Sequence, residues 1–223
     1  EVGLSQILAA ALGGTVSVDG EQVEAELVGP LVDLAERLKD VDSIKARDAP
    51  WNLRAELRPY QQRGLAWLAE MAELRLGGVL ADDMGLGKTV QVLALHLLRP
   101  HPGPTLVVCP ATLMSNWERE AARFAPDVPV HRYHGADRSL DDLPDDAIVV
   151  CTYRSTGTSS PRVVTSTSCP SARDMSRTAR AMRTLPAGAR FALTGTPVEN
   201  RLSDLWALLD WTTPGLLGPL EAF

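Results

Sequence analysis

The sequence lacks any apolar segment long enough to cross a membrane. No apolar run approaches the roughly 20 residues that a membrane-spanning helix requires. The opening stretch EVGLSQILAAALGG has no basic region of the kind that begins a secretory signal. The chain begins with Glu1 rather than Met, so we expect a fragment or a processed chain.

Cysteine is scarce, and histidine forms no ligand cluster. The 3 cysteines, an odd number, follow no metal-binding spacing, so we expect reduced intracellular thiols. They are Cys109, Cys151 and Cys169. The 4 histidines share no spacing with acidic residues or cysteines, and we predict no metal site among them. They are His96, His101, His131 and His134.

A surplus of positive charge is also missing. The formal net charge of −6 argues against strong nonspecific DNA affinity from bulk charge, although a local basic surface can still bind phosphate. Arg177, Arg180 and Arg183 recur at three-residue spacing in a helix expected over 176–185. Two interpretations remain open: a stripe facing DNA phosphates, or a solvated helix face.

Residues 1–50 are expected to form an accessory segment with a linker. TVSVDGEQVEAEL alternates apolar and polar residues around Asp19-Gly20, which predicts a hairpin. PLVDLAERL has helical spacing, with Leu31, Leu34 and Leu38 on one face. IKARDAP, ending at Pro50, is typical of a linker. This gives a small α+β extension before a main domain over 51–223.

Short apolar strands alternate with helices in the main domain. Strands are expected in GGVLA, PTLVVC, PVHRYH, AIVVCTY and RFALTG. Helices are expected in GLAWLAEMAELRL, GKTVQVLALHLL, ATLMSNWEREAARF, SRTARAMRTL and NRLSDLWALLDW. This alternation predicts an α/β fold with a mostly parallel sheet between helices. Trp67 and Trp117 are expected in the core rather than as base-stacking platforms.

The stretch LADDMGLGKTVQ, residues 80–91, predicts a phosphate-binding loop between a buried strand and a helix. Gly85 and Gly87 let the backbone turn its N–H groups toward an anion at a helix N-terminus. Lys88 is expected to reach the β- and γ-phosphates of a nucleotide, and the Thr89 hydroxyl to ligate Mg²⁺. Asp82 stands where the strict pattern has its first glycine.

DDMGLGKTVQ resembles motif I of the Swi/Snf class of DNA-translocating ATPases in helicase superfamily two, whose loops carry an acid at the position of Asp82. LRPYQQRGLAWL resembles the adenine-reading motif, PTLVVCPATLMSNWERE motif Ia, VVCTYR motif Ib, and LTGTPVENRLSDLWALLDW motif III. The resemblance covers residues 52–154 and 176–223. It implies a RecA-like ATP-binding lobe, ATP and Mg²⁺ as cofactors, duplex DNA as partner and, from bacterial relatives, a cytoplasmic location.

The resemblance also implies roles for particular residues. Nucleotide contacts are expected from the upstream motif and the loop: Arg58, Gln61, Asp82, Met84, Gly85, Leu86, Gly87, Lys88 and Thr89. Coupling of nucleotide state to lobe movement is expected from Thr194, Gly195 and Thr196. DNA contacts are expected from Ser115, Asn116 and Thr152, although Ser115 and Asn116 could instead belong to an ordinary helix surface.

The acidic pair that such ATPases need for hydrolysis is missing. In the family an Asp-Glu pair at the end of a buried strand, between motifs Ib and III, holds Mg²⁺ and polarises the attacking water. Between Asp146 and Glu199 the only carboxylate is Asp174, which has no acidic neighbour and follows no apolar strand. Motif II is therefore absent from the sequence, and turnover by this chain is expected to be near zero.

The segment 155–175 differs in composition from the rest of the chain, with 10 Ser or Thr among its 21 residues. Two explanations remain: a flexible insert, or a stretch translated in the wrong reading frame that has replaced the central strand and its acids. By the resemblance, a second RecA-like lobe with arginine fingers should follow Phe223; such a finger contributes about 10³–10⁵ in rate.

The leading hypothesis is the ATP-binding lobe of a Swi/Snf-type DNA-dependent ATPase, with protein partners from transcription or repair. One alternative is a catalytically dead nucleotide-binding or protein-interaction module. Another is an unrelated phosphate-loop kinase or nucleotidase, which TGTPVEN argues against. A response of ATP affinity to duplex DNA separates a motor from a small-molecule kinase.

Overall fold

The computed structural model describes the greater part of the main domain. The described residues are 15–18, 21–24, 32, 36, 44–99, 103–135, 139–152, 163–166, 182–184, 187–197, 202–217 and 220. Several residues singled out in the sequence lie outside them: Leu31, Leu34, Leu38, His101, Cys169, Asp174, Arg177 and Arg180.

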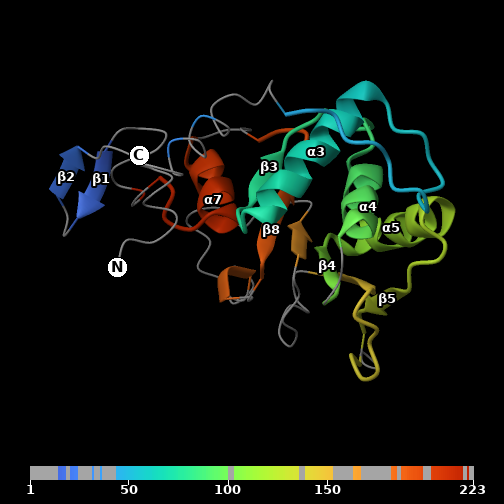
Figure 1. Ribbon diagram of the computed structural model, residues 1–223. Coiled ribbons are helices and arrows are strands. Elements are labelled where there is room, and N and C mark those ends of the chain that lie inside the picture. Colours follow the sequence, from blue (N-terminus) through green and yellow to red (C-terminus); the bar gives the residue numbers. More distant parts are fainter. Residues whose placement is uncertain are drawn as a thin grey trace.

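A six-stranded parallel sheet forms the centre of the domain (Figure 1). Its strands are β3 (Gly78–Leu80), β4 (Thr105–Val108), β5 (Val130–Tyr133), β6 (Ile148–Cys151), β7 (Val163–Ser166) and β8 (Ala189–Leu193), in the spatial order β3-β8-β7-β4-β6-β5. Every position of β4 and β6 is buried, as expected for parallel strands covered on both faces. β5 lies at the edge and is only partly buried.

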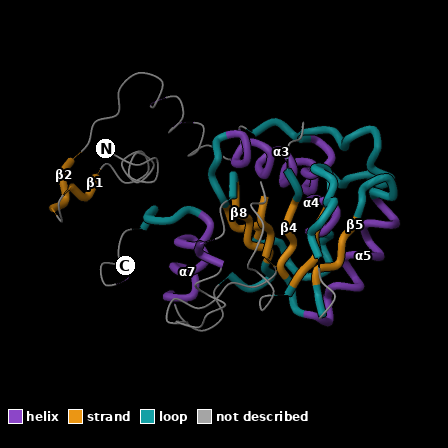
Figure 2. Tube along the Cα trace, turned by 90° about the horizontal axis from the view of Figure 1, so that it is seen from below, coloured by secondary structure: helices purple, strands orange, loops and turns teal. Residues whose placement is uncertain are grey.

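Helices cover both faces of the sheet, which gives three layers (Figures 1 and 2). One face packs against α3 (Pro59–Glu73), α4 (Lys88–Leu98) and α5 (Ala111–Phe124), and the other against α7 (Leu202–Thr212). Successive residues of β8 alternate between the faces: Phe191 packs with the first three helices, and Ala192 packs with α7. The predicted α/β class with a parallel sheet between helices is confirmed.

The described helices lie where the sequence predicted them. Their bounds differ by one or two residues at α4 and α7 and by more at α3, which ends at Glu73 rather than at residue 76. α5 begins and ends where its apolar spacing predicted. α3 begins at Pro59, five residues before the predicted start, because proline is suited to the first helical position and the Gln61 side chain accepts the Arg58 N–H at 2.9 Å. No helix in the described part of the chain is long and apolar enough to span a membrane.

The hairpin predicted in the N-terminal segment is present. β1 (Thr15–Val18) pairs with β2 (Glu21–Glu24) in antiparallel register, so that Val16 lies opposite Val23. Residues 44–50, expected as a linker, instead lie against the main domain. The Arg47 N–H donates to the Gln62 carbonyl at 3.3 Å, Ala49 packs on the core and Pro50 is buried.

The structure contradicts the expectation that segment 155–175 lacks a central strand. β7 lies inside this segment and pairs in parallel with β4 on one side and β8 on the other. Two β-branched residues, Val163 and Val164, begin it, and such residues suit an extended backbone. The sequence analysis did not recognise this strand, because only two apolar residues stand in a segment otherwise rich in Ser and Thr.

The tryptophan prediction is confirmed. Trp117 is 3% exposed within the core beside α5, and Trp67 makes an edge-to-face contact with Phe191, with ring centroids 6.5 Å apart. Within the helix expected over 176–185, residues 182–184 are helical; Met182 is buried under α7 and Arg183 is half-buried.

Candidate nucleotide-binding site

The carboxyl ends of the parallel strands meet at one edge of the sheet, where ligands of open α/β sheets bind. Because β3 and β8 are neighbours, the loop after β3 and the turn after β8 lie side by side. The Thr194 N–H donates to the Leu80 carbonyl at 3.1 Å and joins the two strand ends directly. The predicted phosphate loop and the predicted coupling turn therefore meet at this edge.

Two glycines set the path of the phosphate loop. Gly85 has φ +85°, and Gly87, which caps α4, has φ +77° and ψ +41°. Both values lie in the left-handed region that favours glycine. The Gln91 N–H donates to the Gly87 carbonyl at 3.3 Å as the first bond of α4. The preceding amides of the first turn have no intrahelical acceptor, which suits them to an anion.

Lys88, the first residue of α4, folds its ammonium group over the loop. Its Nζ donates to the Asp82 carbonyl at 2.6 Å and to the Asp83 carbonyl at 3.0 Å. The side chain is half-buried, and Thr89 beside it is half-buried as well. The two loop carbonyls thus hold the Lys88 ammonium group at the place where phosphate oxygens are expected. When a phosphate binds, the ammonium group can exchange its bonds to these carbonyls for bonds to the phosphate.

Gln61 and Tyr60 fasten α3 to the loop. The Gln61 Nε2 donates to the Leu86 carbonyl at 3.0 Å, and the Tyr60 hydroxyl donates to the same oxygen at 3.1 Å. Gln61 also accepts the Arg58 backbone N–H, while the Arg58 side chain is exposed. Gln61 therefore lies at the loop, and its contact with adenine stays a prediction. The sequence analysis missed Tyr60, for which adjacency to Gln61 at the start of α3 was the available signal.

The structure adds Gln91, which the sequence analysis also missed. Its side chain is fully buried, and its Nε2 donates to the Asp82 Oδ2 at 2.9 Å. Its Oε1 has no hydrogen-bond partner and lies against Gly64, where a Cβ would be only 2.0 Å away. Gln91 follows Lys88 by three residues, one helical turn, so helix geometry was the available signal. It holds the Asp82 carboxylate beneath the loop.

The turn 194–197 closes one side of the loop. A Cβ on Gly195 would lie 2.8 Å from the Met84 Cγ and 3.2 Å from the Met84 amide nitrogen. The Thr196 N–H donates to the Thr194 Oγ1 at 3.0 Å. Met84 itself is 85% exposed. The turn therefore lies close against the loop, without room for a side chain at Gly195.

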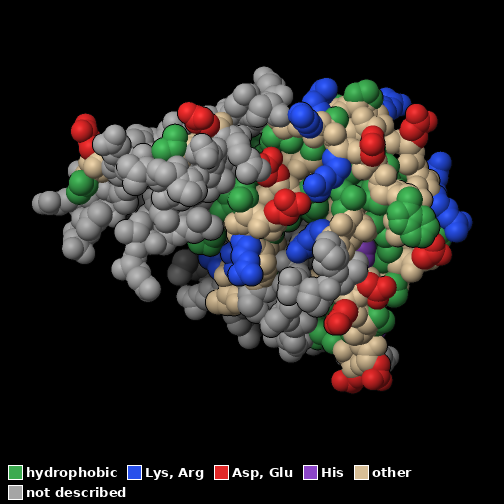
Figure 3. Space-filling view, viewed as in Figure 1, with side chains coloured by type: hydrophobic (Ala, Val, Ile, Leu, Met, Phe, Trp, Pro, Cys, Tyr) green, Lys and Arg blue, Asp and Glu red, His purple; other side chains and the backbone are tan. Residues whose placement is uncertain are grey.

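The predicted DNA-contacting residues lie away from the phosphate loop along the same edge. Ser115 is exposed on α5, and Asn116 beside it is held by bonds to Glu120 and Arg119. Thr152 follows β6 and is 8% exposed. The face in Figure 3 shows Lys and Arg side chains interspersed with Asp and Glu rather than one basic patch.

No carboxylate follows the central strand. β7 ends at Ser166, in register with Val108 of β4 and Ala192 of β8. The next residues, Thr167 and Ser168, are also uncharged. Within the described residues no group of three or more His, Cys, Asp or Glu could hold a metal ion. The loop suits nucleotide phosphates, whereas for Mg²⁺ it contributes the Thr89 hydroxyl without the strand-end acid.

The described cysteines are structural. Burial raises the pKa of Cys109 to about 11 and that of Cys151 to about 12. Both thiols are therefore protonated at neutral pH and poor nucleophiles. They lie on opposite faces of the sheet, because Cys109 packs with α3–α5 and Cys151 with α7. Among the described residues, Cys109 and Cys151 are free thiols.

Comparison with known families gives the same assignment. Residues 60–223 match the SNF2-related domain family. The chain belongs to this family. The predicted resemblance to Swi/Snf ATPases is thereby confirmed.

Similar proteins include bacterial and eukaryotic members. YwqA of Bacillus subtilis, provisionally named an ATP-dependent helicase/translocase, is 34% identical over 218 residues, covering 90% of this chain and 24% of that protein. Human lymphoid-specific helicase is 35% identical over 194 residues, covering 75% and 23%. The yeast TATA-binding protein-associated factor MOT1 is 30% identical over 218 residues, covering 86% and 12%. The chain thus spans a quarter or less of these relatives.

Solved structures agree on the fold. The Sulfolobus solfataricus SWI2/SNF2 ATPase core in complex with double-stranded DNA is 36% identical, with a TM-score of 0.69 over 78% of this chain and 39% of that one. The Sulfolobus solfataricus SWI2/SNF2 ATPase core domain is also 36% identical, with a TM-score of 0.67 over 78% of this chain and 38% of that one. The RecA-like lobe expected from the resemblance is therefore the observed fold.

Proposed function

We propose that this chain is the ATP-binding lobe of a DNA-dependent ATPase whose complete form moves along duplex DNA, acting in the cytoplasm. One observation carries the proposal: the phosphate loop, Gln61 and the turn 194–197 meet at one end of the sheet edge, in a chain of the SNF2-related family. A relative named as a translocase and a similar ATPase core solved with double-stranded DNA support it.

Each part of the site has a role in this proposal. Lys88 and the amides of the first turn of α4 bind the β- and γ-phosphates of ATP. Thr89 would hold Mg²⁺ through its hydroxyl, and the ion would supply positive charge next to the phosphates. Gln61 and Arg58 lie where they can contact adenine. Thr194, Gly195 and Thr196 pass a shift of the loop to β8, and Ser115, Asn116 and Thr152 contact DNA.

A second candidate is a nucleotide-binding module without catalysis. The end of β7 at an uncharged residue favours it, because hydrolysis in this family needs an acidic pair at that place. Under this proposal the chain binds ATP and hydrolyses none. Re-sequencing the source DNA across codons 150–180 separates the cases: a restored frame encoding Asp-Glu after β7 identifies a damaged copy of an active motor.

The test of the main proposal is thermodynamic linkage between ATP and DNA. The ATP affinity of the chain is measured with and without a 20-base-pair duplex, about two turns of DNA, as the probe. We expect DNA to change the ATP affinity by about 5-fold or more, with the reciprocal effect of ATP on DNA affinity. Equal affinities in both conditions would contradict the DNA-dependent proposal and favour the binding module. Failure of the chain to bind ATP would overturn both.

A further inference from the structure

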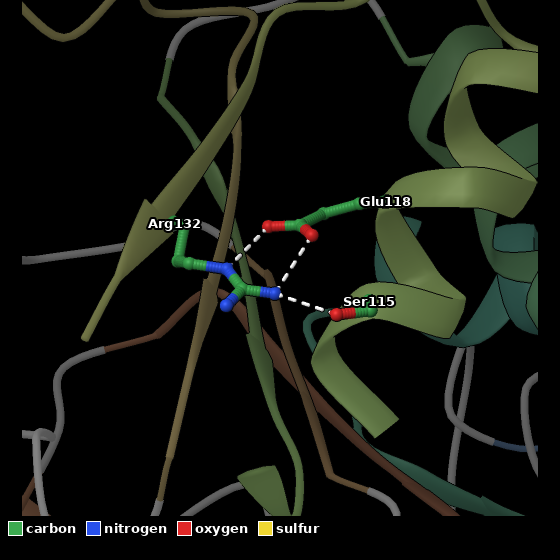
Figure 4. Close-up of polar contacts among 3 residues, drawn as sticks. All are labelled: Ser115, Glu118 and Arg132. Atoms are coloured by element: carbon green, nitrogen blue, oxygen red, sulfur yellow. Dashed lines mark hydrogen bonds and ion pairs between the residues drawn. The ribbon is translucent and has the colours of Figure 1, made fainter. Parts of the chain in front are cut away.

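The side chains of Ser115, Glu118 and Arg132 form a cluster between α5 and the edge strand β5 (Figure 4). The family motifs named above do not connect these three residues. The Arg132 Nε donates to the Glu118 Oε1 at 2.6 Å, and its Nη2 donates to the Glu118 Oε2 at 2.8 Å. The same Nη2 donates to the Ser115 Oγ at 2.9 Å. Two bonds to one carboxylate fix the plane of the guanidinium group.

The arrangement leaves two hydrogen-bond donors available. Within the described residues the Arg132 Nη1 makes no hydrogen bond, so its N–H groups remain free. Ser115 uses its oxygen as an acceptor for Arg132, which leaves its own O–H free to donate. Both residues are exposed. The hydrogen bond to Glu118 also raises the pKa of Arg132, which keeps the guanidinium charged.

The cluster lies far along the sheet from the phosphate loop. Arg132 is the last residue but one of β5. Ser115 lies in the second turn of α5, the helix that follows the carboxyl end of β4. β5 and β3 are the two outer strands of the sheet. A ligand held here therefore does not compete with a nucleotide at the loop after β3.

We propose that Arg132 and Ser115 together bind one phosphate of a DNA backbone. The inference rests on the proposed function. It adds Arg132 to the DNA contacts and joins it to Ser115, which already belongs to the stretch that resembles motif Ia, whereas Arg132 lies outside every such stretch. A guanidinium and a hydroxyl are typical phosphate donors. Glu118 acts as a positioning residue that holds the guanidinium in one orientation. An exposed ion pair by itself adds little to stability, so stability does not account for the cluster.

The orientation of the hydrogen-bond donors matters in this chain because its net negative charge is unfavourable for DNA binding. The net charge of −6 repels DNA at long range, and basic side chains on the visible face are mixed with acidic ones (Figure 3). Binding must then come from donors held in place at short range. Ser115 and Arg132 provide such a pair, whereas Arg119 spends an Nη2 donor on the Asn116 Oδ1.

The test is the affinity of the whole chain for a fluorescent DNA duplex over a series of salt concentrations. We expect Arg132→Gln to weaken binding about 10-fold at low salt and to reduce the salt slope by about 1. Ser115→Ala should weaken binding about 3-fold. The effects of the double substitution should not multiply, because both groups serve one phosphate.

The matched control is Arg63→Gln, which removes the same charge from an exposed position of α3; α4 packs between α3 and α5. We expect it to change the affinity less than about 2-fold at moderate salt, because charge is screened over such distances. Arg132→Lys keeps the charge but cannot form the fork, and should recover less than half of the lost affinity on a logarithmic scale. Unchanged urea midpoints confirm that the variants are folded.

The outcomes separate this inference from the proposed function. If the unaltered chain binds DNA and Arg132→Gln behaves like Arg63→Gln, the Arg132–Ser115 site is wrong and the proposed function stands. If Arg132→Lys restores full binding, charge rather than the oriented fork is responsible, and the inference is overturned. If the unaltered chain binds no duplex at all, both the inference and the DNA-dependent function fail.

Discussion

At the scale of single residues, the phosphate loop has little free space around Gly87. A Cβ built on Gly87 would lie 2.5 Å from the Gln61 Nε2, and the backbone there is left-handed. At Gly85 the backbone is also left-handed, but nothing lies within 4 Å of a Cβ. Alanine at Gly85 would therefore introduce backbone strain alone, whereas alanine at Gly87 would introduce both backbone strain and a steric contact.

Gly87→Ala should lower the free energy of unfolding by about 2–3 kcal/mol. About 1–2 kcal/mol comes from the left-handed backbone, and the remainder from displacing the Gln61 amide. It should also weaken ATP binding, because the Leu86 carbonyl loses one of its two hydrogen bonds from α3, that of Gln61, and keeps only that of Tyr60. Urea unfolding and nucleotide titration measure both effects. Gly85→Ala, the control, should show only the backbone strain; equal losses at the two sites would contradict the steric contribution.

His96 illustrates a buried polar residue with a structural role. Its Nε2 lies 2.9 Å from the Asp146 carbonyl, which can only accept, so Nε2 carries a proton. Its Nδ1 lies 2.9 Å from the Thr105 Oγ1 and accepts from that hydroxyl when the ring is neutral. The ring thus joins the end of α4 to the start of β4 and to the segment before β6.

His96→Ala should lower the free energy of unfolding by about 2–4 kcal/mol, because it leaves a cavity and two polar groups without their partner. Urea denaturation of the chain measures the change. His134→Ala provides the control, since His134 is exposed, and should stay within about 0.5 kcal/mol. A similar small effect for His96→Ala would show that water replaces the ring at little cost.

At the scale of secondary structure elements, β7 decides whether the sheet is continuous. It is bonded on both sides, so its four residues join the β3–β8 pair to the β4–β6–β5 group. Without it the sheet would divide into two parts, each with an open edge. The Ser/Thr-rich segment therefore contributes to the fold although it lacks the acids of a hydrolytic site.

Val164→Pro should destabilise the chain by more than about 3 kcal/mol, because proline removes an N–H from a strand that is paired on both sides. Val130→Pro on the edge strand is the matched control. The Ile148 N–H donates to the Pro129 carbonyl at 2.8 Å, so in a parallel ladder the Val130 N–H points away from β6. If Val164→Pro costs no more than Val130→Pro, β7 does not occupy the centre of the sheet.

At the scale of the whole molecule, the two proposed ligand sites lie at opposite ends of the sheet edge. The nucleotide loop follows β3 at one end, and the Arg132–Ser115 cluster lies beside β5 at the other. Strands and helices of one three-layer domain connect them. Ligand binding at either end should therefore stabilise the entire domain, since the core is shared.

ATP at about 100 times its dissociation constant should raise the free energy of unfolding by about 2.7 kcal/mol. Lys88→Ala should abolish most of this increase, because it removes the ammonium group, now bonded to the Asp82 carbonyl, that we propose binds the phosphates. Thermal or urea unfolding with and without ATP measures the difference. Lys45→Ala, at an exposed position, should retain it; loss of stabilisation in both variants would indicate nonspecific charge binding.

Much of the site was predictable from local patterns. The GLGKT stretch between an apolar strand and a helix predicted the turn and the positions of Lys88 and Thr89, because glycine conformation and helix ends are local properties. The structure brings Gln61 to the loop through its bond to Leu86, whereas its predicted contact with adenine stays a prediction. Tyr60 and Gln91 were missed, because their contacts with Leu86 and Asp82 depend on how α3 and α4 pack against the loop.

The sequence by itself determined the alternation of strands and helices, the phosphate loop and the absence of an acidic pair, since these follow from periodicity and residue type. Only the tertiary structure decided that Val163–Ser166 completes the sheet, because two valines in a polar segment gain their strand from β4 and β8. It alone joined Arg132 to Ser115 and Glu118, since 14 or more residues separate the partners. Local patterns determine turns and periodicity; pairing between distant segments comes from packing the core.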